Sequence, residues 1–141
     1  MRAIDWAYLA GVLDSDGCVS ICTQLKPKRP HYTLRVFVTN TSRILIDWLL
    51  TNVGGTCHIS NLNAPKHHKT AWRWTLRGYG ATPILRATLP YLKVTAKRAE
   101  LGLQFTKTLR NNSRKLTDEE LKERERLYAI LKAMNTPGRV R

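Results

Sequence analysis

Four short segments of this chain alternate apolar and polar residues with a period of two, and they come in two pairs. Such alternation is typical of β-strands that bury one face and leave the other polar. The segments span about residues 18–24, 31–39, 56–60 and 69–77, and their polar faces contain no carboxylate. They predict a four-stranded antiparallel sheet with helices on one face and an open basic face.

Apolar residues at helical spacing lie around these strands, in segments 4–13, 42–53, 82–89, 95–109 and 118–135. A capping box from Thr117 to Glu120 marks the start of the last helix. Gly17 is expected to end the first helix in the left-handed conformation that glycine tolerates. The length fits one α+β domain of order αββαββα over residues 1–110, with a helical extension over residues 111–141. The extension could pack on its own subunit, extend a dimer interface or contact phosphates.

Basic residues dominate the middle of the chain. The net charge is +14, and between Gly17 and Ala99 thirteen Lys or Arg residues accompany one acid, Asp47. A long segment almost free of carboxylates indicates a polyanionic partner. Nucleic acid is favoured over an acidic membrane surface, because no segment pairs a basic face with an exposed apolar one.

The chain has no segment typical of membrane proteins or secretion. Its longest strongly apolar run, residues 6–13, is far shorter than the ~20 residues a spanning helix needs. Aspartates interrupt what would be the apolar part of a signal peptide. Three cysteines are too few for a disulfide framework, so we expect a reducing, intracellular compartment.

The cysteines and histidines are a potential set of zinc ligands. Cys18 and Cys22 share a strand face, but their Cα atoms would lie ~13 Å apart at ~3.3 Å per residue. Zn–S bonds of ~2.3 Å cannot close that gap around one ion. Cys57 and the histidines add no C-x2-C pair, so this pattern disfavours zinc.

The first predicted helix carries a stripe of small residues followed by two carboxylates. Ala7, Ala10, Gly11 and Asp14 fall at helical spacing, and small residues let another helix approach closely. Asp14 and Asp16 would lie at the helix C-terminus, where the dipole disfavours negative charge, so a cation or a donor should compensate. A turn that merely closes the helix is the alternative. An EF-hand loop is excluded, because the alignment lacks acidic ligands at its first and last positions.

Residues 9–17, Leu-Ala-Gly-Val-Leu-Asp-Ser-Asp-Gly, closely resemble the signature of the LAGLIDADG homing endonucleases. The element order over about residues 3–110 is similar to that family, as are Val-Thr-Asn-Thr at 38–41, Gly-Gly at 54–55 and Leu-Pro-Tyr-Leu-Lys-Val at 89–94. One copy of the motif implies a homodimer whose subunits meet through Ala7, Ala10, Gly11 and Asp14. The resemblance implies a sequence-specific endonuclease that hydrolyses phosphodiesters on both strands of a long, near-palindromic DNA site.

The resemblance also implies a set of active-site residues. Asp16 and Gly17 would hold Mg²⁺, with Mn²⁺ as an alternative, and Asn40 would organise solvent near the attacking water. A basic residue of the family falls at Thr95 here, so Lys93 and Lys97 are the candidates for stabilising phosphate charge.

The polar strand faces supply the candidate DNA contacts. Arg and Lys can bond guanine or phosphate, and Gln can bond adenine. Phe37 also points to this face, where it either touches thymine methyl groups or only covers the sheet. The predicted contacts are Gln24, Lys26, Lys28, Arg29, Arg35, His58, Arg73, Thr75 and Arg77.

Two binding functions on the same fold remain open at this point: an RNA-splicing maturase that binds intron RNA, and a non-cleaving DNA-binding protein. Asp16 favours the enzyme, whereas Thr95 in place of a basic residue favours the alternatives. For any of them we expect a bacterial or phage cytoplasm, or an organelle.

Overall fold

The computed structural model describes residues 1–25, 30–109 and 115–136. Its sheet has the order β1-β2-β4-β3, and every neighbouring pair is antiparallel, which confirms the predicted fold class. The strands are β1 (Gly17–Leu25), β2 (Pro30–Asn40), β3 (Thr56–Ile59) and β4 (Trp72–Arg77). The helices are α1 (Ala3–Asp16), α2 (Arg43–Asn52), α3 (Ala81–Thr88), α4 (Ala96–Thr106) and α5 (Asp118–Asn135).

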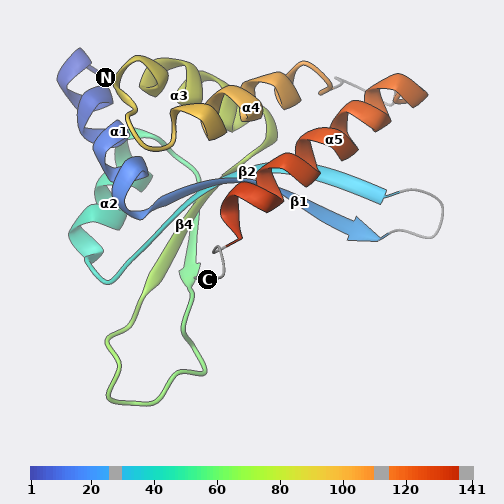
Figure 1. Ribbon diagram of the computed structural model, residues 1–141. Helices are drawn as coiled ribbons and strands as arrows, with labels where there is room; N and C mark the ends of the chain where they lie inside the picture. Colours follow the sequence, from blue (N-terminus) through green and yellow to red (C-terminus); the bar gives the residue numbers. More distant parts are fainter. Residues whose placement is uncertain (26–29, 110–114, 137–141) are drawn as a thin grey trace, which may run out of the picture.

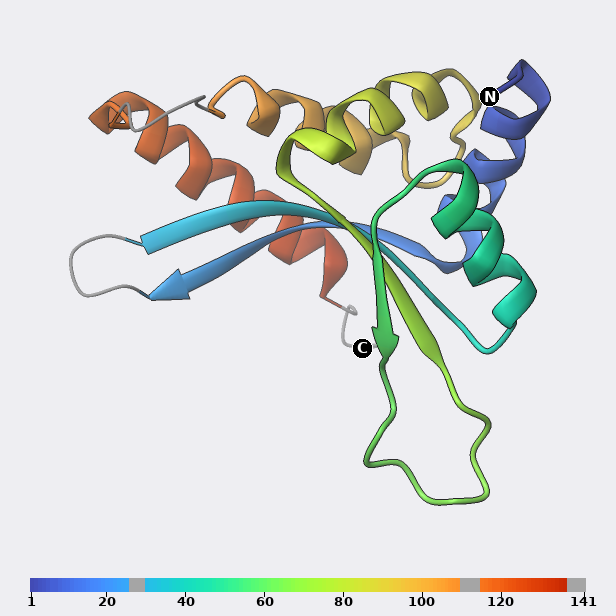
Figure 2. The ribbon, with the colours of Figure 1, turned by 180° about the vertical axis from the view of Figure 1, so that it is seen from behind.

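The helices gather on one side of the sheet, and the two strand hairpins extend away from them. Figure 1 shows α1, α3 and α4 above the sheet, α2 beside it below α1, and α5 crossing the edge strand β1. In the opposite view the β1–β2 and β3–β4 hairpins point in different directions, so the sheet is strongly twisted (Figure 2). The face between the hairpins has no helix over most of its area.

The apolar strand faces and the helices share one core. Leu34, Val36 and Val38 of β2 are fully buried, as alternation predicts for the central part of the sheet. Leu127 and Leu131 of α5 are also fully buried in this core. Among the roles considered for the C-terminal helix, packing on its own subunit is therefore what the structure shows.

Gly17 ends α1 for a different reason from the predicted one. Its φ is −93°, an extended conformation that any residue can adopt. A Cβ at this position would lie 2.6 Å from Leu13 Cα, so close packing against the last helical turn requires glycine here. This corrects the expectation of a left-handed exit.

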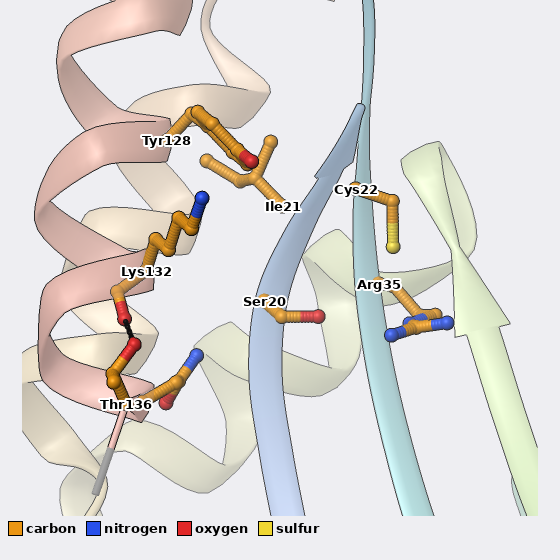
Figure 3. A pocket seen from close by; sticks show the side chains of 8 residues that line it. Ser20, Ile21, Cys22, Arg35, Tyr128, Lys132 and Thr136 are labelled. Atoms are coloured by element: carbon orange, nitrogen blue, oxygen red, sulfur yellow. Dashed lines mark hydrogen bonds between the residues drawn. The ribbon is translucent and has the colours of Figure 1, made fainter. Parts of the chain in front are cut away.

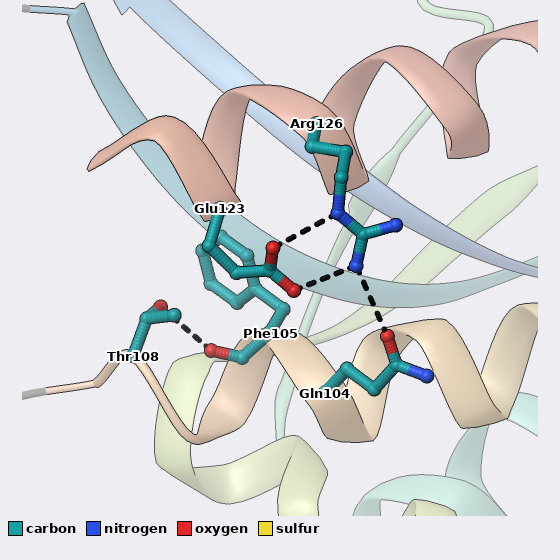
Figure 4. A network of polar contacts seen from close by, with 5 residues as sticks. All are labelled: Gln104, Phe105, Thr108, Glu123 and Arg126. Atoms are coloured by element: carbon teal, nitrogen blue, oxygen red, sulfur yellow. Dashed lines mark hydrogen bonds and ion pairs between the residues drawn. The ribbon is translucent and has the colours of Figure 1, made fainter. Parts of the chain in front are cut away.

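Contacts between α4 and α5 explain why α4 ends earlier than predicted. Beyond Thr106 the chain forms a tight turn in which the buried Thr108 receives two hydrogen bonds from Arg124, at 2.9 Å and 2.8 Å. A second link lies nearby, where Arg126 pairs with Glu123 at 2.7 Å and reaches Gln104 at 3.5 Å (Figure 4). The Arg126 hydrogen bond lowers the pKa of Glu123.

Candidate active site and nucleic-acid interface

Asp16 and Asn40 meet where α1 ends and β2 ends. Asn40 Nδ2 donates to Asp16 Oδ2 at 2.9 Å, and Asn40 Oδ1 accepts from the Ser42 backbone N–H at 2.7 Å. The second bond fixes which way the amide points, so its donor faces Asp16. The Asp16 side chain is exposed, and no described residue donates to its other carboxylate oxygen. The site thus holds an oriented carboxylate with capacity for a cation.

Asp14 has a different environment, although it lies two residues before Asp16. It accepts three backbone hydrogen bonds, from Lys93 at 2.7 Å, Val94 at 3.1 Å and Thr95 at 2.9 Å, and a fourth from the Thr95 hydroxyl at 2.7 Å. Burial alone would raise the pKa of Asp14, but these four bonds outweigh it and lower the pKa below its ordinary value. Asp14 therefore binds the loop before α4, a role that its prediction as a dimer-interface residue did not include.

The same contacts account for Thr95. Its side chain is 6% exposed and is committed to Asp14, so it anchors a loop rather than facing a phosphate. Lys93 and Lys97 flank it with exposed side chains, and Lys97 lies 3.9 Å from Glu100. In the described part of the chain neither lysine side chain contacts Asp16.

Only part of the predicted small-residue stripe lies on the exposed face of α1. Ala7 and Gly11 are exposed, but Ala10 is fully buried in its own core, which excludes it from contact with a partner. Ile4 and Tyr8 complete the exposed face, at 68% and 51% exposure. A Cβ on Gly11 would meet nothing within 4 Å, so no contact with the described residues explains this glycine.

Strand register arranges the polar residues of the sheet in rows. One row joins Ser20, Arg35 and Arg77, and another joins Thr39, Arg73 and His58. Gln24 lies opposite His31, an exposed residue that the sequence reasoning missed although the alternation of its strand places it on this face. The predicted contacts Lys26, Lys28 and Arg29 lie outside the described residues.

Thr75 departs from its predicted role. It is 4% exposed, because Phe37 and Thr56 lie on either side of it in the neighbouring strands. Its side chain is therefore enclosed by its neighbours on the polar face, unlike the exposed Arg77 on the same strand.

Helix α5 adds a cation to the edge of this face. Lys132 lines a shallow pocket with Ser20, Cys22 and Arg35 (Figure 3). The end of α5 is fixed there by Asn135, whose Nδ2 donates to the Val19 carbonyl at 2.9 Å. Sequence periodicity placed α5 correctly but gave no indication that it reaches the polar side of β1.

Two further findings bear on the site. Within the described ranges no three His, Cys, Asp or Glu side chains form a group that could hold a metal ion. In those same ranges, no helix combines the length and apolar character needed to cross a bilayer.

Solved structures similar to this chain include homing endonucleases bound to DNA. No family model and no curated protein sequence matches the chain. The homing endonuclease I-CvuI in complex with its target is similar over 99% of this chain and 87% of its own, with a TM-score of 0.78 and 20% identity. The archaeal intron-encoded homing endonuclease I-Vdi141I, complexed with DNA, is similar over 96% of this chain and 86% of its own, with a TM-score of 0.78 and 12% identity.

A third structure differs in length. The LAGLIDADG meganuclease I-AabMI, bound to uncleaved DNA, gives a TM-score of 0.63 and 24% identity over 94% of this chain but 44% of its own. The resemblance carried by the Leu9–Gly17 motif is thus confirmed at the level of architecture: the chain has the fold of the LAGLIDADG homing endonucleases.

Proposed function

We propose that this protein is a divalent-metal-dependent, sequence-specific endonuclease that cuts both strands of DNA as a homodimer. The observation that carries the proposal is the Asp16–Asn40 pair, an exposed and oriented carboxylate at the edge of a basic sheet face that lacks acids. The similar structures I-CvuI and I-Vdi141I are homing endonucleases in complex with DNA, which supports the same substrate class here.

The sheet is the surface proposed for DNA. A twisted antiparallel sheet fits the major groove, where base edges carry a distinct donor and acceptor code. Arginine rows aimed from this face can bond guanine edges or phosphates, and Gln24 can bond adenine. We assign recognition to Gln24, Arg35, His58, Arg73 and Arg77, together with the basic loop residues Lys26, Lys28 and Arg29.

A homodimer through α1 is proposed on the exposed face that holds Ala7 and Gly11. Glycine within a helix costs about 0.5–1 kcal/mol relative to alanine, and no contact in the described part of the chain offsets that cost. Close approach of a second α1 would explain the glycine. Asp16 ends the same helix, so such packing would bring the two Asp16 carboxylates toward the dimer axis. A twofold dimer would read a near-palindromic site.

Asp16 fits a divalent ion, because carboxylate oxygen is the ligand that Mg²⁺ prefers and a second subunit and DNA phosphates could complete the set. Asp16 and the adjoining Gly17 would hold the ion, Mg²⁺ or alternatively Mn²⁺. When bound, it would polarise the phosphodiester and lower the pKa of an attacking water. Asn40 holds Asp16 in place, and Lys93 and Lys97 are proposed to stabilise phosphate charge from the loop that Asp14 anchors.

The test uses a randomised duplex library incubated with the protein and Mg²⁺, beside EDTA and Asp16→Asn controls. Sequencing the ends should reveal discrete cuts at near-palindromic sites that both controls lack. Selective retention of duplexes without any cutting, in Mg²⁺ and in Mn²⁺, would replace the nuclease with a binding protein. Neither cutting nor retention of any duplex would turn attention to RNA, and so to a maturase.

A further inference from the structure

Phe37 lies between two arginines on the open face of the sheet. The guanidinium carbon of Arg35 is 4.6 Å from the ring centroid, and that of Arg73 is 4.4 Å from it. Arg35 precedes Phe37 by two residues on β2, whereas Arg73 pairs with Thr39, two residues beyond Phe37. The two cations therefore approach the ring from opposite ends along the strand.

The ring restrains both side chains. Arg73 is also held by a hydrogen bond from its Nε to Thr39 Oγ1 at 3.1 Å. Arg35 Nε is buried and has no hydrogen-bond partner among the described residues, so contact with the ring is a restraint on this guanidinium. A guanidinium against a ring face keeps its in-plane N–H donors available, because they point away along its edges.

The charge pattern around Phe37 is unfavourable unless an anion is present. Arg35 lies directly opposite Arg77, and like charges in such cross-strand pairs are destabilising. The strands of this face contain no carboxylate to offset them. The electron-rich faces of the Phe37 ring compensate part of the repulsion between the arginines. The ring also orders two flexible arginine side chains before binding, which lowers the entropy cost of recognition.

We propose that Phe37 is a positioning residue that holds Arg35 and Arg73 over two different base pairs in each half-site. Because Arg35 and Arg73 approach the ring from opposite ends along β2, the two guanidinium groups face different positions of a bound duplex. The inference rests on the proposed DNA-binding function. Phe37 is thereby given a third role, beside contact with thymine methyl groups and covering of the sheet: its ring orders two arginine side chains.

The first arm of the test needs no DNA. In the full-length protein, ¹H–¹⁵N spectra of arginine Nε–H groups are compared for wild type, Phe37→Leu and Phe37→Tyr, with assignments from Arg35→Lys and Arg73→Lys. Phe37→Leu should remove ring-current shifts from both arginines, and Phe37→Tyr should keep them. Tyr79→Leu removes an exposed ring elsewhere and is the matched control. Unchanged arginine signals in Phe37→Leu would overturn the proposal.

The second arm measures base preference at every position of a duplex selected by the wild type. Phe37→Leu should lose about tenfold preference at two separate positions per half-site and keep the others, whereas Phe37→Tyr and Tyr79→Leu keep all. Phe37→Leu with a full wild-type profile would overturn this inference alone. A wild type without any duplex preference would overturn both the inference and the proposed function. Thermal unfolding shows that each variant is folded.

Discussion

At the C-terminal end of α1, two carboxylates two residues apart have opposite environments. Asp14 accepts four hydrogen bonds and stabilises a loop, whereas the exposed Asp16 accepts one and keeps an oxygen for a cation. The helix dipole disfavours both charges, so each needs its own compensation. The difference explains why one belongs to folding and the other to the proposed chemistry.

Replacing Asp14 with Asn removes the charge around which four donors are arranged. We expect a loss of about 2 kcal/mol in the free energy of unfolding at pH 7, since hydrogen bonds to charged groups contribute about 1.5–3 kcal/mol. Because folding lowers the pKa of Asp14, its stabilisation is full above the unfolded pKa of about 3.9 and is lost as pH falls through the folded value. Urea unfolding should therefore show the wild type converging on D14N below about pH 4.

Asp47→Asn is the matched control for D14N. It removes an exposed ion pair with Arg43, one turn away on α2, and should cost under about 0.5 kcal/mol. Equal losses for the two variants at pH 7 would contradict the role assigned to Asp14.

Asn40→Ala leaves Asp16 without its orienting donor. Partners of metal-binding side chains typically change metal affinity by about 10–100-fold, so the Mg²⁺ concentration for half-maximal cleavage should rise by that factor. Asn52→Ala removes a side-chain bond to Trp48 on the exposed side of α2 and should leave the Mg²⁺ titration unchanged. A wild-type titration curve for N40A would exclude its positioning role.

At the scale of elements, local pattern determined much of the fold. Alternation in β2 and the capping box at Thr117 predicted elements that the structure contains. The bond between Asp14 and Thr95 joins residues far apart in the chain, and nothing local signals it. The burial of Ala10 was missed because small residues on a helix do not reveal which side meets the core of their own chain.

The attachment of α5 to the sheet edge is a second contact that the sequence could not predict. Arg98 donates to the Met134 carbonyl at 2.8 Å and to Asn135 Oδ1 at 2.9 Å, and Asn135 donates to Val19 of β1. These bonds join α4, the end of α5 and the edge strand. They fix Lys132 beside the polar face of the sheet.

Asn135→Ala should release the end of α5 without unfolding the domain. Net hydrogen-bond contributions predict a loss of about 1–2 kcal/mol, with the burial of Leu127 and Leu131 holding the rest of the helix. Hydrogen exchange should quicken over the last turns of α5 and stay unchanged in β2. Lys122→Ala, at an exposed site of the same helix, is the control, and uniform acceleration across the chain would contradict a local attachment.

At the scale of the whole molecule, one subunit has a basic recognition face, one oriented carboxylate and an unexplained glycine on α1. This chain aligns with 87% of the length of the similar nuclease I-CvuI, but with 44% of the length of I-AabMI. This chain therefore corresponds to about half of the longer structure, which fits the proposal that two copies form the working enzyme.

Gly11→Leu should weaken the proposed dimer. The added side chain would meet open space within its own subunit but would clash with a closely packed second α1. Sedimentation should show a dimer dissociation constant raised by about 100-fold, which corresponds to the upper part of the 1–3 kcal/mol typical of overpacking. Ala133→Leu adds similar bulk to an exposed site on α5. A dimer of unchanged affinity in G11L would exclude this face.

The central claim is that Asp16 performs the chemistry while the sheet performs recognition. The most direct test is single-turnover cleavage of a selected duplex by the wild type and by Asp16→Asn, with affinity for the same duplex measured in Ca²⁺. The single-turnover cleavage rate of D16N should fall by more than about 10³-fold, or about 4 kcal/mol of transition-state stabilisation. Its affinity for the duplex should stay within a few-fold of the wild-type value. Cleavage by D16N at the wild-type rate would show that Asp16 does not perform the chemistry.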